Sequence, residues 1–226
     1  MKRYVSPRTR LGLALVVSSL VSMGLWGVGA LINHDTSFGY MWWNLFLAWP
    51  ALVFALWLER LLRTKLWSSW TALLATLLWF SFLPNSFYVI SDFVHLTEQP
   101  RVDIVFDVVM LASFGVNGLI LGYLSLYMVH NQLRKRLSAL FSGTIVATVL
   151  LLDSFAIYIG RDLRWNTWDV IANPASLVFD VSDRLVNVRA HPQVVSITLS
   201  FFVFLGSIYV VIWYLLRVAR QQKTID

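Results

Sequence analysis

The sequence has no cysteine among its 226 residues and few charged side chains. Without cysteine there are no disulfide bonds, no thiolate nucleophiles and no metal sites with cysteine ligands. Charged residues make up 13% of the chain, against about 25% in a typical soluble domain. The chain also lacks a P-loop or other nucleotide-binding signature, which argues against ATP-driven work by this chain alone.

Apolar residues dominate instead. The chain is 58% hydrophobic with a mean hydropathy of +0.68, a composition typical of a membrane protein. Because the length suits one domain, we expect residues 1–226 to form a single integral membrane domain. The net charge of +6 is typical of some nucleic-acid-binding proteins, but here the basic residues form short clusters beside apolar stretches. Membrane topology explains that placement, so we expect contact with a lipid bilayer and none with nucleic acid.

Six apolar stretches reach or approach the roughly 20 residues that a bilayer-spanning helix needs. They predict an all-α fold, a polytopic membrane helix bundle of about six transmembrane helices. The spans are expected over residues 11–32, 41–58, 67–83, 104–130, 138–160 and 192–216. The first stretch is longer than the apolar region of a cleavable signal peptide, so we expect it to be retained as a helix.

The basic residues predict the orientation of these spans. Counted by connection, 13 of the 18 Lys and Arg residues lie on the side of the two chain ends. The bias alternates through all six spans, so both termini are expected to be cytoplasmic. Ten of the 12 carboxylates and three of the four histidines fall on the opposite, outer side. Any chemistry is therefore expected on the extracytoplasmic side.

The last outer connection, about 161–191, is too long for a simple turn. Asn173-Pro174 is a favourable helix start, with Asn as the cap and Pro at the first helical position. Five apolar residues then recur at helical period and predict an outer interfacial helix; they are Leu177, Val178, Val181, Leu185 and Val188. Phe179 and Val186 interrupt the polar side of this helix.

Residues 84–96 contain polar groups that topology does not require. Pro84 is expected to break the third span or to begin a new helix. If the stretch is α-helical, four polar residues share one face; they are Asn85, Tyr88, Asp92 and His95. Asp92 and His95 then touch and suit metal ligation, or the roles of a general base and its orienting carboxylate.

Two alternatives weigh against a catalytic or metal role for this pair. A hydrogen-bonded network that fixes a helix kink needs the same residue types. A zinc site usually takes three or four ligands, and the spacing of the further outer candidates, His34, Asp35 and His191, does not specify a site. The metal is left open.

Asp153 lies inside the fifth span. A carboxylate in an apolar helix is costly unless it faces a partner or a cavity, which makes it a functional candidate. A salt bridge to Arg161 or Arg164 is the structural alternative. Both readings are kept.

The second polar stretch covers residues 160–169. Arg161 and Arg164 can hold a phosphate or carboxylate, and neighbouring Trp165 and Asn166 can line the ligand. Alternatively the two arginines pair with Asp162 and Asp169 in an interfacial belt. Asp103 and Asp107 add carboxylates at the same membrane depth, where they also suit capping of the fourth span.

These residues carry a resemblance to a known family. The sequence Pro84-Asn85…Tyr88…Ser91-Asp92…His95-Leu96, Asp107, and Tyr158…Gly160-Arg161…Arg164-Trp165-Asn166-Thr167-Trp168-Asp169 together resemble the bacterial membrane-protein family catalogued as domain of unknown function 1361. The resemblance covers roughly residues 40–216. Ser91 and Thr167 stand where the family prefers Thr and Ser, and both keep a hydroxyl. The resemblance implies a multi-pass protein of the bacterial plasma membrane and favours one site formed jointly by the two polar stretches. It supplies no reaction.

Three functions remain open. The first is an outer-face enzyme or binding protein for a lipid or envelope precursor, with Asp92, His95 and Asp153 as catalytic residues. Its ligand-binding residues would be Asn85, Tyr88, Asp107, Arg161, Arg164, Trp165, Asn166 and Asp169. The second is a small-solute or ion transporter with Asp153 on its path, although six spans without a repeat favour this less for a monomer. The third is a structural partner subunit, and a homo-oligomer or membrane partner suits all three; the cofactor is left open.

Overall fold

A computed structural model describes residues 6–34, 36–97, 103–163, 165 and 172–222. These residues contain seven α-helices and no β-strand. Six are long and apolar enough to cross a membrane: α1 (Pro7–Asn33), α2 (Tyr40–Leu61), α3 (Trp70–Tyr88), α4 (Ile104–Arg134), α5 (Ala139–Asp162) and α8 (Gln193–Gln222). The predicted all-α bundle with six spans is confirmed, and each predicted span overlaps one of these helices.

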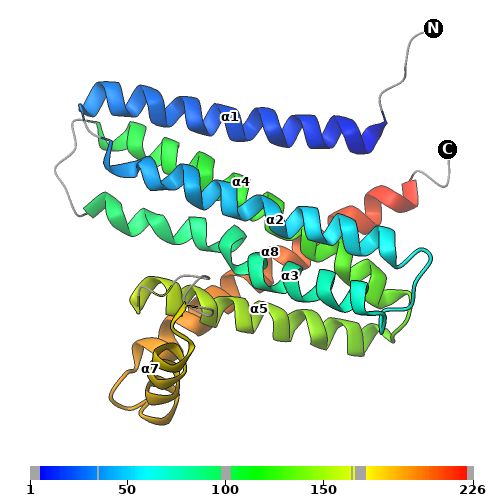
Figure 1. Cartoon of the computed structure of the whole chain (residues 1–226). Helices are drawn as coiled ribbons and strands as arrows, with labels where there is room; N and C mark the ends of the chain where they lie inside the picture. Colours follow the sequence, from blue (N-terminus) through cyan, green and yellow to red (C-terminus); the bar gives the residue numbers. More distant parts are fainter. Residues whose placement is uncertain (1–5, 35, 98–102, 164, 166–171, 223–226) are drawn as a thin grey trace, which may run out of the picture.

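The six long helices run roughly side by side (Figure 1). α1 begins and α8 ends at one end of the bundle, which we call the terminal end; the opposite end is the distal end. α4 is the central helix, because it contacts α1, α2, α3, α5 and α8. α5 and α8 pack together on one side, and α1 lies along the other side (Figure 1).

Side-chain caps mark where several helices begin. The Ser6 and Ser138 hydroxyls accept hydrogen bonds from the backbone N–H groups of Thr9 and Phe141. Asp103 accepts one from the N–H of Phe106 at 3.0 Å and so caps α4. The capping role predicted for Asp103 is thus confirmed.

Three glycines of α4 allow the end of α3 and the first residues after it to lie directly against α4. A Cβ atom at Gly118 would meet the Ser86 carbonyl oxygen at 2.5 Å, and one at Gly122 would meet the Phe87 ring at 2.7 Å. Gly115 faces Ile90 in the same way, at 2.9 Å. The backbones approach closely because these positions carry no side chain, as in other membrane helix pairs.

Pro84 does not break the third span, contrary to the prediction. α3 continues through Pro84 to Tyr88, and the chain then tightens into a 3-10 helix, η2 (Val89–Thr97). A proline removes one backbone hydrogen bond, and packing in a membrane bundle compensates for that loss. The 3-10 helix places residues three apart on one face, so Asp92 and His95 align with each other and with buried Val89.

The predicted helix in the last distal connection is present as α7 (Pro174–Val186), which lies to one side of the bundle near the distal part of α5 and runs crosswise to the spans (Figure 1). Pro174 occupies its first turn as expected. Asn173 precedes the helix, but its side chain makes no capping hydrogen bond. Asn173 therefore stands at the predicted position before the helix, but the capping hydrogen bond predicted for its side chain is not formed.

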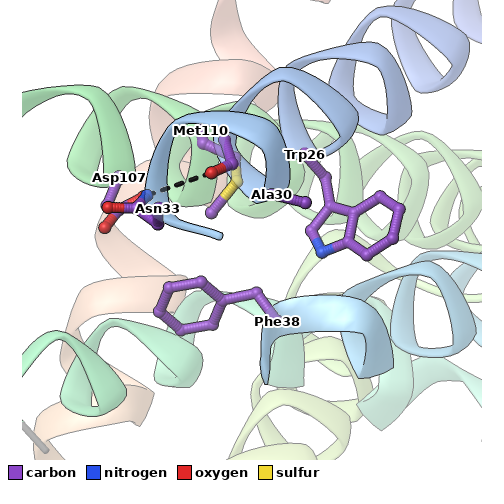
Figure 2. A pocket seen from close by; sticks show the side chains of 7 residues that line it. Trp26, Ala30, Asn33, Phe38, Asp107 and Met110 are labelled. Atoms are coloured by element: carbon purple, nitrogen blue, oxygen red, sulfur yellow. Dashed lines mark hydrogen bonds between the residues drawn. The ribbon is translucent and has the colours of Figure 1, made fainter. Parts of the chain in front are cut away.

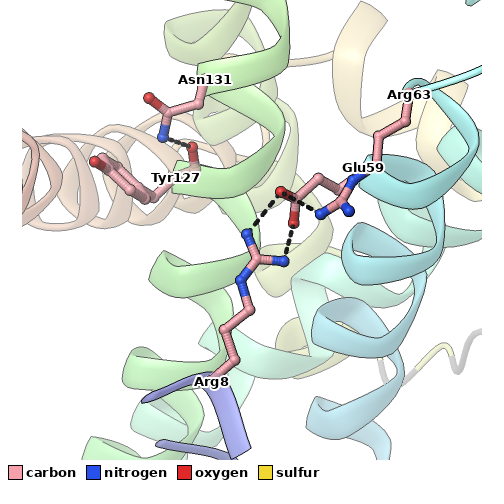
Figure 3. Close-up of polar contacts among 5 residues, drawn as sticks. All are labelled: Arg8, Glu59, Arg63, Tyr127 and Asn131. Atoms are coloured by element: carbon pink, nitrogen blue, oxygen red, sulfur yellow. Dashed lines mark hydrogen bonds and ion pairs between the residues drawn. The ribbon is translucent and has the colours of Figure 1, made fainter. Parts of the chain in front are cut away.

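Polar contacts fasten α1 to the bundle at both ends and in the middle. At the terminal end, Arg8 donates two hydrogen bonds to Glu59 of α2, at 2.9 and 3.3 Å (Figure 3). In the middle, the Asn117 amide of α4 donates to the Ser22 hydroxyl at 2.9 Å. These bonds give α1 a fixed position that lipid-like packing alone would not specify.

Candidate functional site

Asp92 lies where three elements meet at the distal end. The Asn44 amide of α2 donates to Asp92 Oδ2 at 2.9 Å, and Arg161 Nη1 of α5 donates to Asp92 Oδ1 at 3.2 Å. Asp92 itself belongs to η2 and is only 1% exposed. Both carboxylate oxygens therefore have a donor, one of them cationic, as a buried carboxylate requires. We call Asn44, Asp92 and Arg161 the distal polar site.

Close packing of α5 against α3 brings Arg161 to Asp92. Gly160 lies against the Tyr88 ring, where an added Cβ atom would come within 3.2 Å of a ring carbon. α5 continues past Gly160 to Asp162, so this glycine permits the approach and does not end the helix. Arg161 then projects from the last turn of α5 toward the start of η2.

Arg161 uses only one edge of its guanidinium group within the described part of the chain. Nη1 is paired with Asp92, whereas Nη2 is buried and has no hydrogen-bond partner among the described residues. The side chain as a whole is 18% exposed. Arginine holds phosphate and carboxylate groups through two parallel N–H groups, so the second edge is suited to an anionic group.

His95 stands one 3-10 turn after Asp92, close enough to interact with it electrostatically. Its half-buried imidazole packs edge-on against Tyr40 of α2, with ring centroids 5.5 Å apart. The predicted proximity of Asp92 and His95 is thus present. It arises from 3-10 geometry and not from the α-helix assumed for residues 84–96.

Asp107 is buried in a different setting, against α1 (Figure 2). The Asn33 amide donates to Asp107 Oδ1 at 3.2 Å and to the Gly29 carbonyl at 3.1 Å. A cavity of about 10 Å³ adjoins this contact, with Phe38 and Met110 in its wall. That volume suits about one water molecule. The described contacts tie Asp107 to α1, whereas Asp92 is tied to α2 and α5.

Asp153 stands apart from both settings. It is fully buried in α5, and neither of its carboxylate oxygens has a hydrogen-bond partner among the described residues. The predicted alternative of a salt bridge to Arg161 is not formed, because Arg161 pairs with Asp92. Arg164, the other predicted partner, lies outside the described residues.

Of the remaining predicted ligand residues, three make contacts within the described chain and two lie outside the described residues. The Asn85 amide donates to the Phe82 carbonyl of its own helix at 3.5 Å, and Tyr88 packs on Gly160. Trp165 Nε1 donates to Asp180 of α7 at 3.0 Å, which ties the start of the last distal connection to the amphipathic helix. Asn166 and Asp169 lie outside the described residues.

The described residues contain no group of three or more His, Cys, Asp or Glu side chains that suits a metal ion. Of the further metal candidates, His34 ends α1 in the left-handed conformation, with φ 50°, and His191 contacts Arg184 and Asp183. Asp35 lies outside the described residues.

Sequence reasoning missed Asn44, the third member of the distal polar site. It lies near the start of α2, directly after two tryptophans. The usable signal was an amide inside an apolar span, since such a group needs a polar partner in the bundle. The same signal marks Asn117, which binds Ser22 of α1.

The fold and the buried polar groups define a multi-pass helical membrane protein with one polar site, formed by Asn44, Asp92 and Arg161, at its distal end. The sequence matches the model of a protein family, described as protein of unknown function (DUF1361), over residues 43–211. The chain therefore belongs to that family, which confirms the resemblance. No curated protein and no solved structure matches the chain.

Proposed function

We propose that this membrane protein binds an anionic group, a phosphate or carboxylate of a lipid or envelope precursor, at the distal polar site. The observation that carries the proposal is that only one of the two terminal nitrogens of Arg161 has a hydrogen-bond partner among the described residues. Asp92 fixes one edge of the guanidinium, and the buried Nη2 atom lacks a partner in the described chain. A buried cationic N–H without an acceptor is costly, so an oxygen from a bound group is the natural completion.

The geometry favours binding over catalysis at Asp92. A general base must have an oxygen free to take a proton in reach of the substrate. Both Asp92 oxygens already accept hydrogen bonds, from Asn44 and from Arg161. Asp92 is better suited to orient the arginine.

We further propose that the distal end is the outer face of a bacterial plasma membrane. The support is the excess of Lys and Arg in the connections at the terminal end, which the positive-inside rule places in the cytoplasm. The distal polar site then faces the compartment where envelope precursors are assembled. All of residues 1–226 act as one integral membrane domain in this proposal, alone, as a homo-oligomer or with a membrane partner.

Native mass spectrometry of the full-length protein in detergent tests the binding proposal, with phosphatidylglycerol and phosphatidylcholine as probes. The wild type should retain phosphatidylglycerol more tightly. Arg161→Gln should weaken that binding by roughly tenfold or more, since a hydrogen bond to a charged group contributes about 1.5–3 kcal/mol. Arg217→Gln is the matched control, because it removes one positive charge at the terminal end.

Equal loss in the two variants would contradict a specific site and indicate general charge attraction. Competition with inorganic phosphate separates the two sources of the anion. Displacement of phosphatidylglycerol by phosphate assigns the site to a soluble phosphate compound, and resistance to displacement assigns it to a lipid.

A further inference from the structure

Asp153 is the buried ionisable group that the distal polar site does not use. It lies nine residues before the end of α5, which at 1.5 Å per residue is about 14 Å from the distal end of that helix. Its depth is therefore close to the middle of a hydrocarbon layer about 30 Å thick. At 0% exposure it has no contact with solvent.

Among the described residues, no charged side chain pairs with Asp153. Asp153 shares the buried face of α5 with Val146, Leu150 and Ile157, which belong to the main apolar cluster of the bundle. α5 packs against α3, α4 and α8. The titratable side chains that these elements contribute to the cluster are Tyr88 of α3, Tyr123 and Tyr127 of α4, and Tyr209 of α8. Further titratable groups are His130 of α4, which bonds to Tyr209, and Asp92 of η2, which pairs with Arg161. None of them forms a hydrogen bond or ion pair with Asp153 in the described chain.

An ionised carboxylate in such a place is prohibitively unfavourable, whereas a protonated carboxyl group loses far less on leaving water. A group of this kind inside a membrane helix, kept without a structural partner, is typical of a proton-handling site. We propose that Asp153 is a proton-binding site whose carboxyl group carries a proton that exchanges with water from the distal end. This inference is independent of anion binding at Arg161.

The distribution of polar groups on α5 indicates the side of access. Toward the distal end, the buried face continues with Ser154, whose hydroxyl is bonded to the Leu150 carbonyl, and then with Ile157, Tyr158 and Arg161. The Tyr158 hydroxyl and Arg161 Nη2 are buried and have no hydrogen-bond partner among the described residues. Toward the terminal end the buried face continues with Leu150 and Val146. Next comes Ser142, whose hydroxyl is bonded to carbonyls of its own helix. Water reaches a buried group where polar side chains can hold it, so the distal route is favoured.

Infrared spectroscopy of the full-length protein in dodecyl maltoside micelles, which contain no carbonyl group, tests this inference through the carbonyl stretch of protonated carboxylic acids. The wild type should show such a band, Asp153→Asn should lose it, and transfer of the wild type into D2O should shift it. Asp103→Asn is the control and should leave the band unchanged, because Asp103 is an exposed helix cap. Circular dichroism checks that each variant keeps its helices.

Two results would overturn the inference. If Asp153→Asn leaves the band intact, the residue is ionised and has a partner. If the band is lost in Asp153→Asn but never shifts in D2O, the proton is sealed in and does not exchange. Should Asp153→Asn fail to fold, Asp153→Glu must retain the band at an altered frequency; an unaltered frequency would likewise contradict the assignment.

Discussion

At the scale of single residues, the distal polar site is built on the ion pair of Arg161 and Asp92. Asn44 and Arg161 satisfy the two oxygens of Asp92, and Arg161 Nη2 has no hydrogen-bond partner among the described residues. A buried ion pair is weak evidence for stability by itself, because desolvation offsets much of the Coulomb attraction. Its value here is positional: it fixes the arginine where three elements meet.

A double-mutant cycle on Asp92→Asn and Arg161→Gln measures this pairing. Each single change leaves its partner without a counter-ion, so each should lower the free energy of unfolding. The double change should cost less than the two single costs added together, by roughly 0.5–3 kcal/mol. The measurement is unfolding by denaturant in mixed micelles. A cycle of Asp103→Asn with Arg161→Gln is the control and should be additive; equal coupling in both cycles would show that the pair is not specific.

Gly118 tests the close approach of α4 to the end of α3. In Gly118→Ala the new methyl group meets a backbone oxygen at 2.5 Å, and backbone cannot move aside as a flexible side chain can. Overpacking of this kind typically costs about 1–3 kcal/mol. Gly143→Ala is the matched control, because nothing lies within 4 Å of its added Cβ. The thermal midpoint in detergent should fall only for Gly118→Ala, and equal midpoints would contradict the packing described.

At the scale of elements, most helices could be predicted from apolar length, whereas the geometry around Asp92 could not. The six spans follow from composition, since a bilayer needs about 20 apolar residues whatever their tertiary partners. Where α changes to 3-10 after Tyr88, Val89 and Ile90 pack against Gly118 and Gly115 of α4, which are distant in sequence. The proximity of Asp92 and His95 could be predicted, because the two residues are three apart in sequence. The hydrogen bonds of Asp92 to Asn44 and Arg161 could not be predicted, because those residues lie on other helices.

α7 shows how burial redraws a predicted helix face. Leu177 and Val181 are half-buried, so these two predicted residues face the protein. Four apolar residues are exposed on one arc of about 120°, at 100° per residue; they are Val178, Phe179, Leu185 and Val186. Phe179 and Val186, which interrupted the polar face in the prediction, therefore complete a face for lipid.

A pair of spin labels tests whether α7 rests on the membrane. Because the chain has no cysteine, Val186→Cys and Asn187→Cys each give a single labelling site. Val186 is 81% exposed on the apolar arc, and its label should be protected from a water-soluble relaxation agent and accessible to oxygen. Asn187, one residue on, bonds to Asp183 and should show the reverse. Equal accessibility at the two positions would contradict an interfacial α7.

At the scale of the whole molecule, the proposed binding of an anion and of a proton depends on which side of the membrane the distal end faces. The basic residues at the terminal end argue for the cytoplasm there, and the carboxylates and histidines gather toward the other side. A charge bias of this kind is a statement about topology and not about a reaction. It determines which compartment can supply an anionic ligand or a proton to the distal end.

Single cysteines in two exposed connections test the orientation directly. Ser68→Cys lies between α2 and α3 at the terminal end, and Ala190→Cys lies between α7 and α8 at the distal end. A membrane-impermeant maleimide should label Ala190→Cys in intact cells and Ser68→Cys only after the cells are opened. The opposite pattern would invert the topology and place the distal polar site in the cytoplasm.

We propose that an anionic group is bound at Arg161 Nη2, the atom that has no hydrogen-bond partner among the described residues. An experimental structure of the full-length protein in nanodiscs containing phosphatidylglycerol tests it most directly. If Arg161 binds an anionic group, density for a phosphate is expected at about 2.7–2.9 Å from Arg161 Nη2, the usual distance for a charged N–H···O contact. The hydrogen bond from Nη1 to Asp92 should be retained. A structure in which Nη2 is bonded to a carbonyl or carboxylate of the protein itself, and no head group lies near it, would contradict anion binding at Arg161.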